Sequence, residues 1–175
     1  DVKTRLGKKG VGLVDVRSPA EYVGDIIAPP GMTETAQRAG HIPGAVNIPH
    51  EQNWQDPQTA AKLTRKEVQT CDGMALKDEA ALRALYAKLD PGKETIVYCQ
   101  SGVRASQTAT VLRALGLRDV KVYEPAWLGY AGMLTAPAEN EVFVNVGALN
   151  SKIANLESQV KGLEEELTKL KGEQR

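Results

Sequence analysis

The fold is decided by the stretch Thr95-Ile96-Val97-Tyr98-Cys99-Gln100-Ser101-Gly102-Val103-Arg104, which is followed by the helix-forming segment 105–115. The apolar residues before Cys99 predict a buried strand, and the residues after Arg104 predict a helix. A cysteine between the two lies at the positive end of the helix dipole, where the thiolate is favoured. Because the thiolate is the nucleophile, we expect Cys99 to be reactive, with Arg104 as a fixed positive charge beside it.

The loop that follows Cys99 has the composition of an anion-binding nest. Its successive backbone N–H groups can converge on one point, and Gly102 permits the tight turn that this requires. Four residues separate Cys99 from Arg104, which suits one extra sulfur atom better than the tetrahedral phosphate held by the longer loop of a phosphatase. The alternative is a cysteine that only packs in the core. The strand, glycine, arginine and helix that accompany Cys99 favour the reactive interpretation.

Strands and helices alternate along the chain. Short apolar or β-branched runs predict strands at 11–16, 45–48, 95–98 and 120–123, and helical spacing or capping predicts helices at 18–22, 77–89 and 105–115. Residues 25–40 contain two prolines and two glycines and predict an excursion over the surface. We therefore expect a three-layer α/β/α domain around a mainly parallel sheet, with ligands at the carboxyl ends of the strands, where Cys99 falls.

Three segments together resemble the rhodanese family of sulfurtransferases. They are the loop CQSGVRAS at 99–106, Leu13-Val14-Asp15-Val16-Arg17-Ser18-Pro19-Ala20-Glu21-Tyr22, and Gly40-His41-Ile42-Pro43-Gly44-Ala45-Val46-Asn47-Ile48-Pro49. They follow the family's order and spacing over about four fifths of the chain, and the run 26–32 is similar to the catalytic half of tandem thiosulfate sulfurtransferases. The resemblance implies transfer of a sulfane sulfur from thiosulfate or a related donor, through a persulfide on Cys99, to cyanide or a thiol.

The resemblance also implies roles for particular residues. Cys99 is the expected nucleophile, and the expected donor-binding residues are Arg104, Gln100, Ser101, Gly102, Val103, Arg17 and Glu21. Arg17 has an alternative role that we favour, a structural ion pair with Asp15 under the loop. Glu21 falls where the family often carries a charge on the pocket rim, from which it could pair with Arg104. No cofactor or metal is implied.

His41 and Trp127 are further polar or aromatic candidates near these segments. His41 precedes the turn Ile42-Pro43-Gly44 and is a candidate general base. Attack by a preformed thiolate needs no general base, so we interpret His41 as a structural residue. Trp127 is interpreted as a core or pocket-wall residue. The family pattern usually has a second tryptophan a few residues on, which this chain lacks, and the identity of the acceptor is left open.

Three functions follow from these residues. The first is a sulfurtransferase enzyme. The second is a sulfur carrier or sensing module whose Cys99 is loaded by another protein and which is docked through a C-terminal coiled coil. The third, an arsenate reductase or phosphatase, is disfavoured by the short loop.

Composition bounds the domain organisation. The chain has 175 residues, 42% of them hydrophobic, which is enough for one well-filled core. We expect a catalytic domain at 1–140 and a helix at 145–173. The 22 basic and 22 acidic residues balance, so no basic patch predicts nucleic acid or an anionic membrane surface, and the expected partners are a small sulfur donor and a thiophilic acceptor.

Two features of the sequence bear on where the protein is located. No run is long enough to cross a bilayer. The sequence starts at Asp1 without a methionine, which favours the periplasm over the cytoplasm but leaves the compartment open. Cys71 has no obvious mate, so no disulfide framework is predicted; it is either a resolving thiol or a loop cysteine without a role.

The C-terminal segment carries a heptad repeat. Its apolar residues alternate steps of three and four and are Val146, Leu149, Ile153, Leu156, Val160, Leu163, Leu167 and Leu170. Mostly β-branched residues at a and leucine at d favour a parallel two-stranded coil, in which Lys152 faces Glu157 and Glu166 faces Lys171 of the partner. We therefore expect a parallel homodimer through 146–170; the alternative is an amphipathic helix folded back on the domain.

Overall fold

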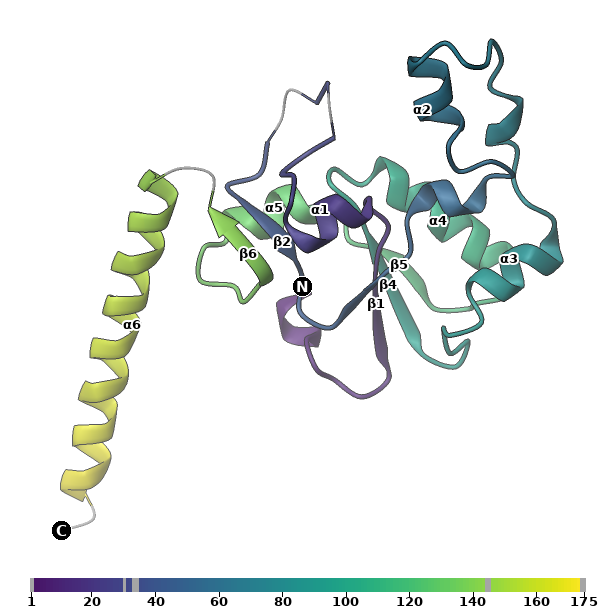
Figure 1. The fold of residues 1–175 in the computed structure, drawn as a ribbon. Coiled ribbons are helices and arrows are strands. Elements are labelled where there is room, and N and C mark those ends of the chain that lie inside the picture. The colour runs from purple at the N-terminus through teal and green to yellow at the C-terminus, as the bar shows by residue number, and fades with distance from the viewer. Residues whose placement is uncertain (1, 30, 33–34, 144–145, 174–175) are drawn as a thin grey trace.

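The computed structural model describes residues 2–29, 31–32, 35–143 and 146–173. Four strands form a parallel sheet in the order β3-β1-β4-β5 (Figure 1). They are β3 (Ala45–Asn47), β1 (Val11–Asp15), β4 (Glu94–Tyr98) and β5 (Val120–Val122). The two central strands are in register, with Val14 opposite Val97. The predicted α/β fold with a parallel sheet is confirmed.

The sheet is covered on both faces, which makes it the middle of three layers. Val14 and Val97 belong to a core that includes residues of α3 (Glu79–Leu85) and α4 (Val103–Ala114). Leu13 and Ile96, which point to the opposite face, belong to a second core with α5 (Ala126–Gly132). Burial on both faces explains why these strands are apolar runs rather than alternating ones.

Helix α1 (Pro19–Val23) begins where the sequence predicts. The Ser18 hydroxyl accepts the Glu21 N–H at 3.3 Å, and the Glu21 carboxylate accepts the Ser18 N–H at 3.0 Å, which completes a capping box. Pro19 occupies the first helical position, where its missing N–H costs nothing. The helix ends at Gly24, whose φ of 86° is left-handed.

The expected surface excursion at 25–40 is wrong at its end. Arg38–His41 form a buried strand, β2, which pairs antiparallel with β6 (Glu139–Phe143). Gly40 has a φ of 107°, and a Cβ there would lie 2.4 Å from the Glu139 carbonyl oxygen. A glycine that suggests a loop in the sequence therefore serves a bulged strand pair. Strand β6 runs past residue 140, and Phe143 lies opposite Arg38.

The remaining elements are short. They are the 3₁₀ turns η1 (Lys3–Arg5), η2 (His50–Asn53) and η3 (Asp72–Met74) and the helix α2 (Thr59–Thr64). A buried hydrogen-bond chain fastens η2 against the α4 side of the sheet. Tyr86 donates to Asn53 Oδ1 at 2.6 Å, and Asn53 Nδ2 donates to Thr108 at 3.2 Å.

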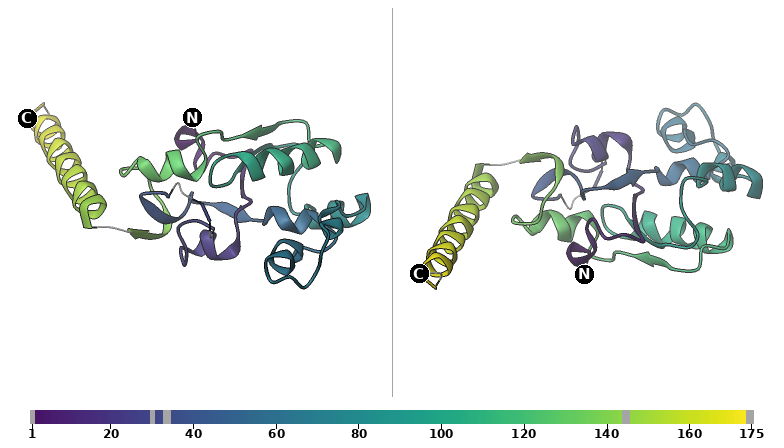
Figure 2. Two further views of the ribbon diagram at one scale, coloured as in Figure 1. Left: turned by 90° about the horizontal axis from the view of Figure 1, so that it is seen from above. Right: turned by 90° about the horizontal axis from the view of Figure 1, so that it is seen from below.

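Helix α6 (Val146–Glu173) extends away from the rest of the chain in all three views (Figures 1 and 2). At its base Lys152 donates to Glu141 of β6, and Glu141 in turn accepts from the buried Arg38. Val146, the first apolar residue of the predicted heptad repeat, has a side chain outside the part of the chain that the structure describes. No helix among the described residues is both long and apolar enough to cross a membrane.

Candidate active site

Cys99 follows the carboxyl end of the central strand β4, and the loop 99–102 leads from it into α4. The Gly102 N–H donates to the Cys99 sulfur with an N···Sγ distance of 3.1 Å. Gly102 is the N-cap of α4 and has a φ of 101°, a conformation that a side chain would strain. The sulfur thus lies at the amino end of a 12-residue helix, where the dipole favours negative charge.

The back of this loop is fixed by α5. The N–H of Trp127 donates to the Cys99 carbonyl at 2.8 Å, and the N–H of Leu128 donates to the Gln100 carbonyl at 3.1 Å. These bonds use the free donors at the start of α5 and hold both loop carbonyls toward that helix. Sequence reasoning missed α5, since its alanines and glycines show no helical spacing of apolar residues.

Arg104 closes the loop through a two-point ion pair with Glu21. Arg104 Nη1 donates to Glu21 Oε2 at 2.8 Å and Nη2 donates to Oε1 at 2.7 Å. The Glu21 side chain has no exposed surface, and that of Arg104 is 17% exposed. The pairing that the sequence suggested is therefore present, although Glu21 lies buried beneath the loop and not on a pocket rim.

The charges of this pair stabilise each other. Burial alone would raise the pKa of Glu21, but Arg104 and Ser18 outweigh it, so that pKa lies below its ordinary value. Burial alone would lower the pKa of Arg104, but Glu21 outweighs it, and the charges of Cys99 and Glu51 act in the same direction. Both side chains are consequently ionised at neutral pH.

Glu51 is a charged neighbour of Arg104 that sequence reasoning missed. It lies in η2, where its carboxylate is 3.0 Å from His50 Nδ1. Burial opposes its ionisation, but the adjacent His50 ring and the positive charge of Arg104 contribute to a pKa below the ordinary value. No pattern in the sequence marks this residue, because its position depends on the turn of η2 against α4.

Arg17, which the sequence offers as a donor-binding residue, lies in the interior of the domain. Its side chain has no exposed surface. Its Nη2 donates to Asp15 Oδ2 at 2.6 Å and to the Gly40 carbonyl at 2.7 Å, and its guanidinium carbon lies 4.7 Å from the centre of the Trp127 ring. Burial opposes its charge, but Asp15 outweighs this and raises the pKa. The favoured interpretation, a structural ion pair under the loop, is confirmed.

The other loop residues point in different directions. Gln100 is buried and donates to the Ile27 carbonyl at 3.2 Å, so its side chain joins the loop to the segment before β2. Ser101 is exposed, and Val103 is 77% exposed. Trp127 is fully buried between Arg17 and Tyr130, which agrees with its interpretation as a core residue.

His41 is used on both ring nitrogens. Nδ1 lies 2.8 Å from the Tyr22 carbonyl and Nε2 lies 2.9 Å from a Glu139 carboxylate oxygen. The ring stacks on Tyr22 with centroids 3.7 Å apart. These contacts join α1, β2 and β6, which agrees with the structural interpretation of His41.

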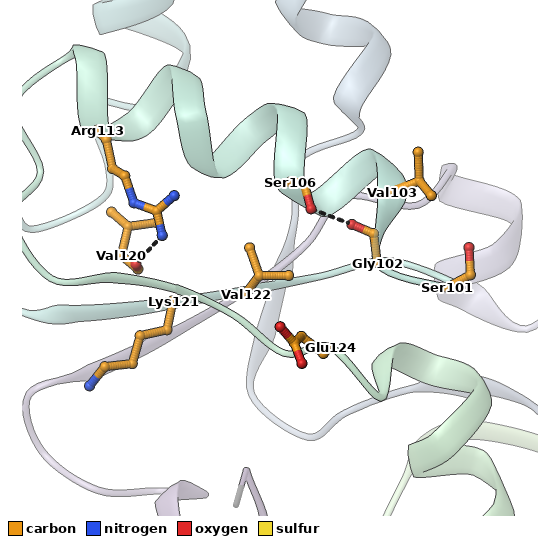
Figure 3. A pocket seen from close by; sticks show the side chains of 9 residues that line it. All are labelled: Ser101, Gly102, Val103, Ser106, Arg113, Val120, Lys121, Val122 and Glu124. Carbon is orange, nitrogen blue, oxygen red and sulfur yellow. Dashed lines mark hydrogen bonds between the residues drawn. The ribbon is translucent and has the colours of Figure 1, made fainter.

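A surface pocket of about 730 Å³ borders the loop on its outer side, between α4 and β5 (Figure 3). Ser101, Gly102 and Val103 line one end, and Arg113 and Lys121 line the other. Cys99 does not line it, and its side chain has no exposed surface. The pocket therefore does not open onto the sulfur in this structure.

Neither a metal centre nor a disulfide forms in the part of the chain that the structure describes. No three His, Cys, Asp or Glu side chains come together there in a way that could hold a metal ion. Cys71 is exposed and Cys99 is buried, and both are free thiols.

The chain is similar in sequence to a known family of domains. Residues 1–132 match the model of the rhodanese-like domain. The chain is 41% identical over 134 residues to a Haloferax volcanii protein named "Putative thiosulfate sulfurtransferase", covering 75% of this chain and 41% of that protein. It is 38% identical over 132 residues to a thiosulfate sulfurtransferase of Corynebacterium glutamicum, covering 74% and 38%. The chain thus spans less than half the length of these relatives.

A solved structure shares the fold. The anaerobic ergothioneine biosynthesis enzyme of Chlorobium limicola, in complex with trimethyl histidine, superposes with a TM-score of 0.58 at 24% identity. The match covers 78% of this chain and 30% of that one. At this level of identity the likeness concerns the fold alone.

Proposed function

Because the chain belongs to the family of rhodanese-like domains, we propose that it is a sulfurtransferase that carries a sulfane sulfur from thiosulfate, as a persulfide on Cys99, to cyanide or a thiol. One observation supports this most directly: the Gly102 N–H donates to Cys99 Sγ at the amino end of α4. A hydrogen bond to sulfur in this position stabilises the thiolate, which is the reactive form. The names of the relatives from Haloferax volcanii and Corynebacterium glutamicum support the choice of donor.

The reaction takes place in two displacements at sulfur. In the first, the Cys99 thiolate attacks the sulfane sulfur of thiosulfate. The bond between the two sulfur atoms of thiosulfate breaks, and sulfite leaves with the electron pair. In the second, cyanide attacks the terminal sulfur of the persulfide, the bond to Sγ breaks, and the electron pair returns to Cys99 as thiocyanate leaves. No proton needs to be removed by a base, which agrees with the engagement of both His41 nitrogens.

Arg104 acts in this proposal as a positioning residue with a charge near the sulfur. Two of its five N–H donors are taken by Glu21, so the net charge available to a donor is smaller than a free arginine would give. The ion pair fixes the end of the loop, and the loop amides with the α4 dipole provide the main stabilisation of negative charge. Gln100, Ser101 and Val103 contribute backbone rather than side-chain groups.

The test is the transfer of sulfur from thiosulfate to cyanide, followed as thiocyanate. We expect Cys99→Ala to abolish transfer, because no other residue takes its place. Cys71→Ala is the matched control, and it should leave the rate unchanged because Cys71 is exposed and has no part in the loop. A Cys99→Ala variant that keeps most of its rate would overturn the assignment.

The carrier and phosphatase alternatives are distinguished by assays of the same variants with other substrates. A carrier would acquire a persulfide on Cys99 from a protein donor and show no turnover with free thiosulfate. A phosphatase would hydrolyse a phosphoester and lose that activity in Cys99→Ser. Either result contradicts the proposed enzyme. The proposed chemistry makes no use of α6.

A further inference from the structure

Helix α6 carries a continuous apolar face that the described residues leave exposed. Seven side chains at the a and d positions of its heptads are between 41% and 66% exposed: Leu149, Ile153, Leu156, Val160, Leu163, Leu167 and Leu170. The helix extends away from the catalytic sheet (Figures 1 and 2) and is not folded back on the domain. A stripe of this size on an isolated helix is typical of a surface that is covered by a partner.

We propose that the partner is a second copy of this chain, and that the two α6 helices form a parallel, two-stranded coiled coil. The helix is 28 residues long, which corresponds to four heptads, and sustained repeats of three to four heptads are typical of coiled coils. Ile153 and Val160 are β-branched at a, and every d position is leucine. This combination favours two strands over three or four.

A hollow on the surface of α6 fits this packing. A groove of about 370 Å³ on α6 is lined by Ile153, Leu156, Glu157, Val160, Lys161 and Glu164. The first four occupy successive a, d, e and a positions. Four residues in this arrangement form the hole that receives one apolar side chain from a facing helix. In a parallel pair the side chain in that hole is the partner's Leu156.

The charges beside the seam favour the parallel orientation. In a parallel pair, Glu166 at g faces the partner's Lys171 at e, and Lys152 faces the partner's Glu157. Lys152 already donates to Glu141 within its own chain. The pair of Glu166 with Lys171 has no such competing contact and therefore gives the stronger argument for the parallel orientation. An antiparallel pair sets the e positions against one another, which brings Glu157 next to the partner's Glu157 or Glu164. Like charges there oppose that arrangement.

The parallel arrangement has a consequence for the catalytic domains. Both would lie at the amino end of the coil. Lys152, in the second turn of α6, is joined through Glu141 to the buried Arg38, whose guanidinium also donates to the carbonyls of Ala136, Met133 and Tyr130. The base of the coil is thus attached to the α5 side of the domain, and the amino end of α4, where Cys99 lies, is left free of the coil.

Sedimentation of the full chain tests the association independently of any activity. We expect a dimer that dissociates on dilution. The double variant Leu156→Glu, Leu163→Glu should sediment as a monomer, because each substitution places a charge at a d position of the helix–helix interface. Ser151→Glu with Ser158→Glu is the matched control: it adds the same charge at f positions on the outer face and should remain a dimer. Circular dichroism checks that both variants keep the folded domain.

Three sedimentation results would overturn the proposal. They are a wild-type monomer at every concentration, a trimer or tetramer, and a dimer that survives both leucine substitutions.

Orientation is tested by a single disulfide. In a background of Cys71→Ser and Cys99→Ser, Leu170→Cys places a thiol at a d position near the carboxyl end. In a parallel pair the two thiols face each other, and oxidation yields a covalent dimer. In an antiparallel pair they are about 30 Å apart at 1.5 Å per residue, and no covalent dimer forms. A dimer by sedimentation that fails to cross-link would contradict the parallel arrangement.

Discussion

Glu21 and Arg104 join helix α1 to the first turn of α4, directly after the loop that begins at Cys99. The two nitrogen–oxygen distances are 2.8 Å and 2.7 Å, and the carboxylate is also held by the Ser18 N–H and hydroxyl at 3.0 Å each. One buried carboxylate therefore completes the cap of α1 and fixes the guanidinium at the start of α4. The geometry of the loop that follows Cys99 depends on an element more than 70 residues earlier in the chain.

Glu21→Gln should lower the free energy of unfolding by about 3 kcal/mol, because it leaves the Arg104 charge largely buried without a partner. Arg104→Gln should have a similar effect. The double substitution should cost less than the sum of the two, since it removes both charges together. Urea unfolding of the four proteins measures this coupling, and strict additivity would show that the pair contributes nothing specific.

The same pair predicts an acid-sensitive fold. The pKa of Glu21 is lower in the folded protein than its ordinary value of 4.5, so the unfolded chain binds more protons in the window just below and around that value. Stability is therefore fully present above this window and is lost as pH falls toward the folded pKa. Unfolding measured across this range should show a smaller loss in Glu21→Gln than in the wild type. Equal slopes would contradict the depressed pKa.

Arg17→Met should reduce stability and leave donor affinity unchanged. The substitution leaves the buried Asp15 carboxylate without its ionic partner. Breaking a buried ion pair in this way lowers the free energy of unfolding by about 3–5 kcal/mol. Since the Arg17 side chain is fully buried, the KM for thiosulfate of the folded variant should match that of the wild type. A stable variant with a greatly increased KM would restore Arg17 to the donor site.

Gly102→Ala should reduce the rate of transfer. The left-handed φ of 101° strains any residue with a Cβ by about 1–3 kcal/mol, and relief of that strain moves the amide away from Cys99 Sγ. Gly162→Ala is the matched control, because a Cβ there meets open space in α6. That control should stabilise the helix by about 1 kcal/mol and leave the rate unchanged. Equal rates in both variants would show that the Gly102 amide is unimportant.

The central unit could be predicted from the sequence because its signals are local. The β-branched run before Cys99, the glycine at the turn and the helix after Arg104 each act over a few residues, and the structure has β4 and α4 where they indicate. The capping box at Ser18 is equally local. The heptad repeat predicts a helix, and α6 is present.

The parts that could not be predicted depend on distant contacts. Strand β2 contains Arg38 and Gly40, which look like loop residues. Arg38 can be buried because carbonyls of residues 130, 133 and 136 accept its N–H groups, and Gly40 fits because the β6 backbone lies against it. Glu51 gives no signal either, since its proximity to Arg104 arises from the way η2 packs on α4.

The mass of the intact protein after exposure to thiosulfate shows whether Cys99 accepts a sulfur atom. We expect the gain of one sulfur atom, located on Cys99, present in Cys71→Ser, absent in Cys99→Ser, and lost again when cyanide is added. No gain of sulfur, or a gain that persists in Cys99→Ser, would contradict it.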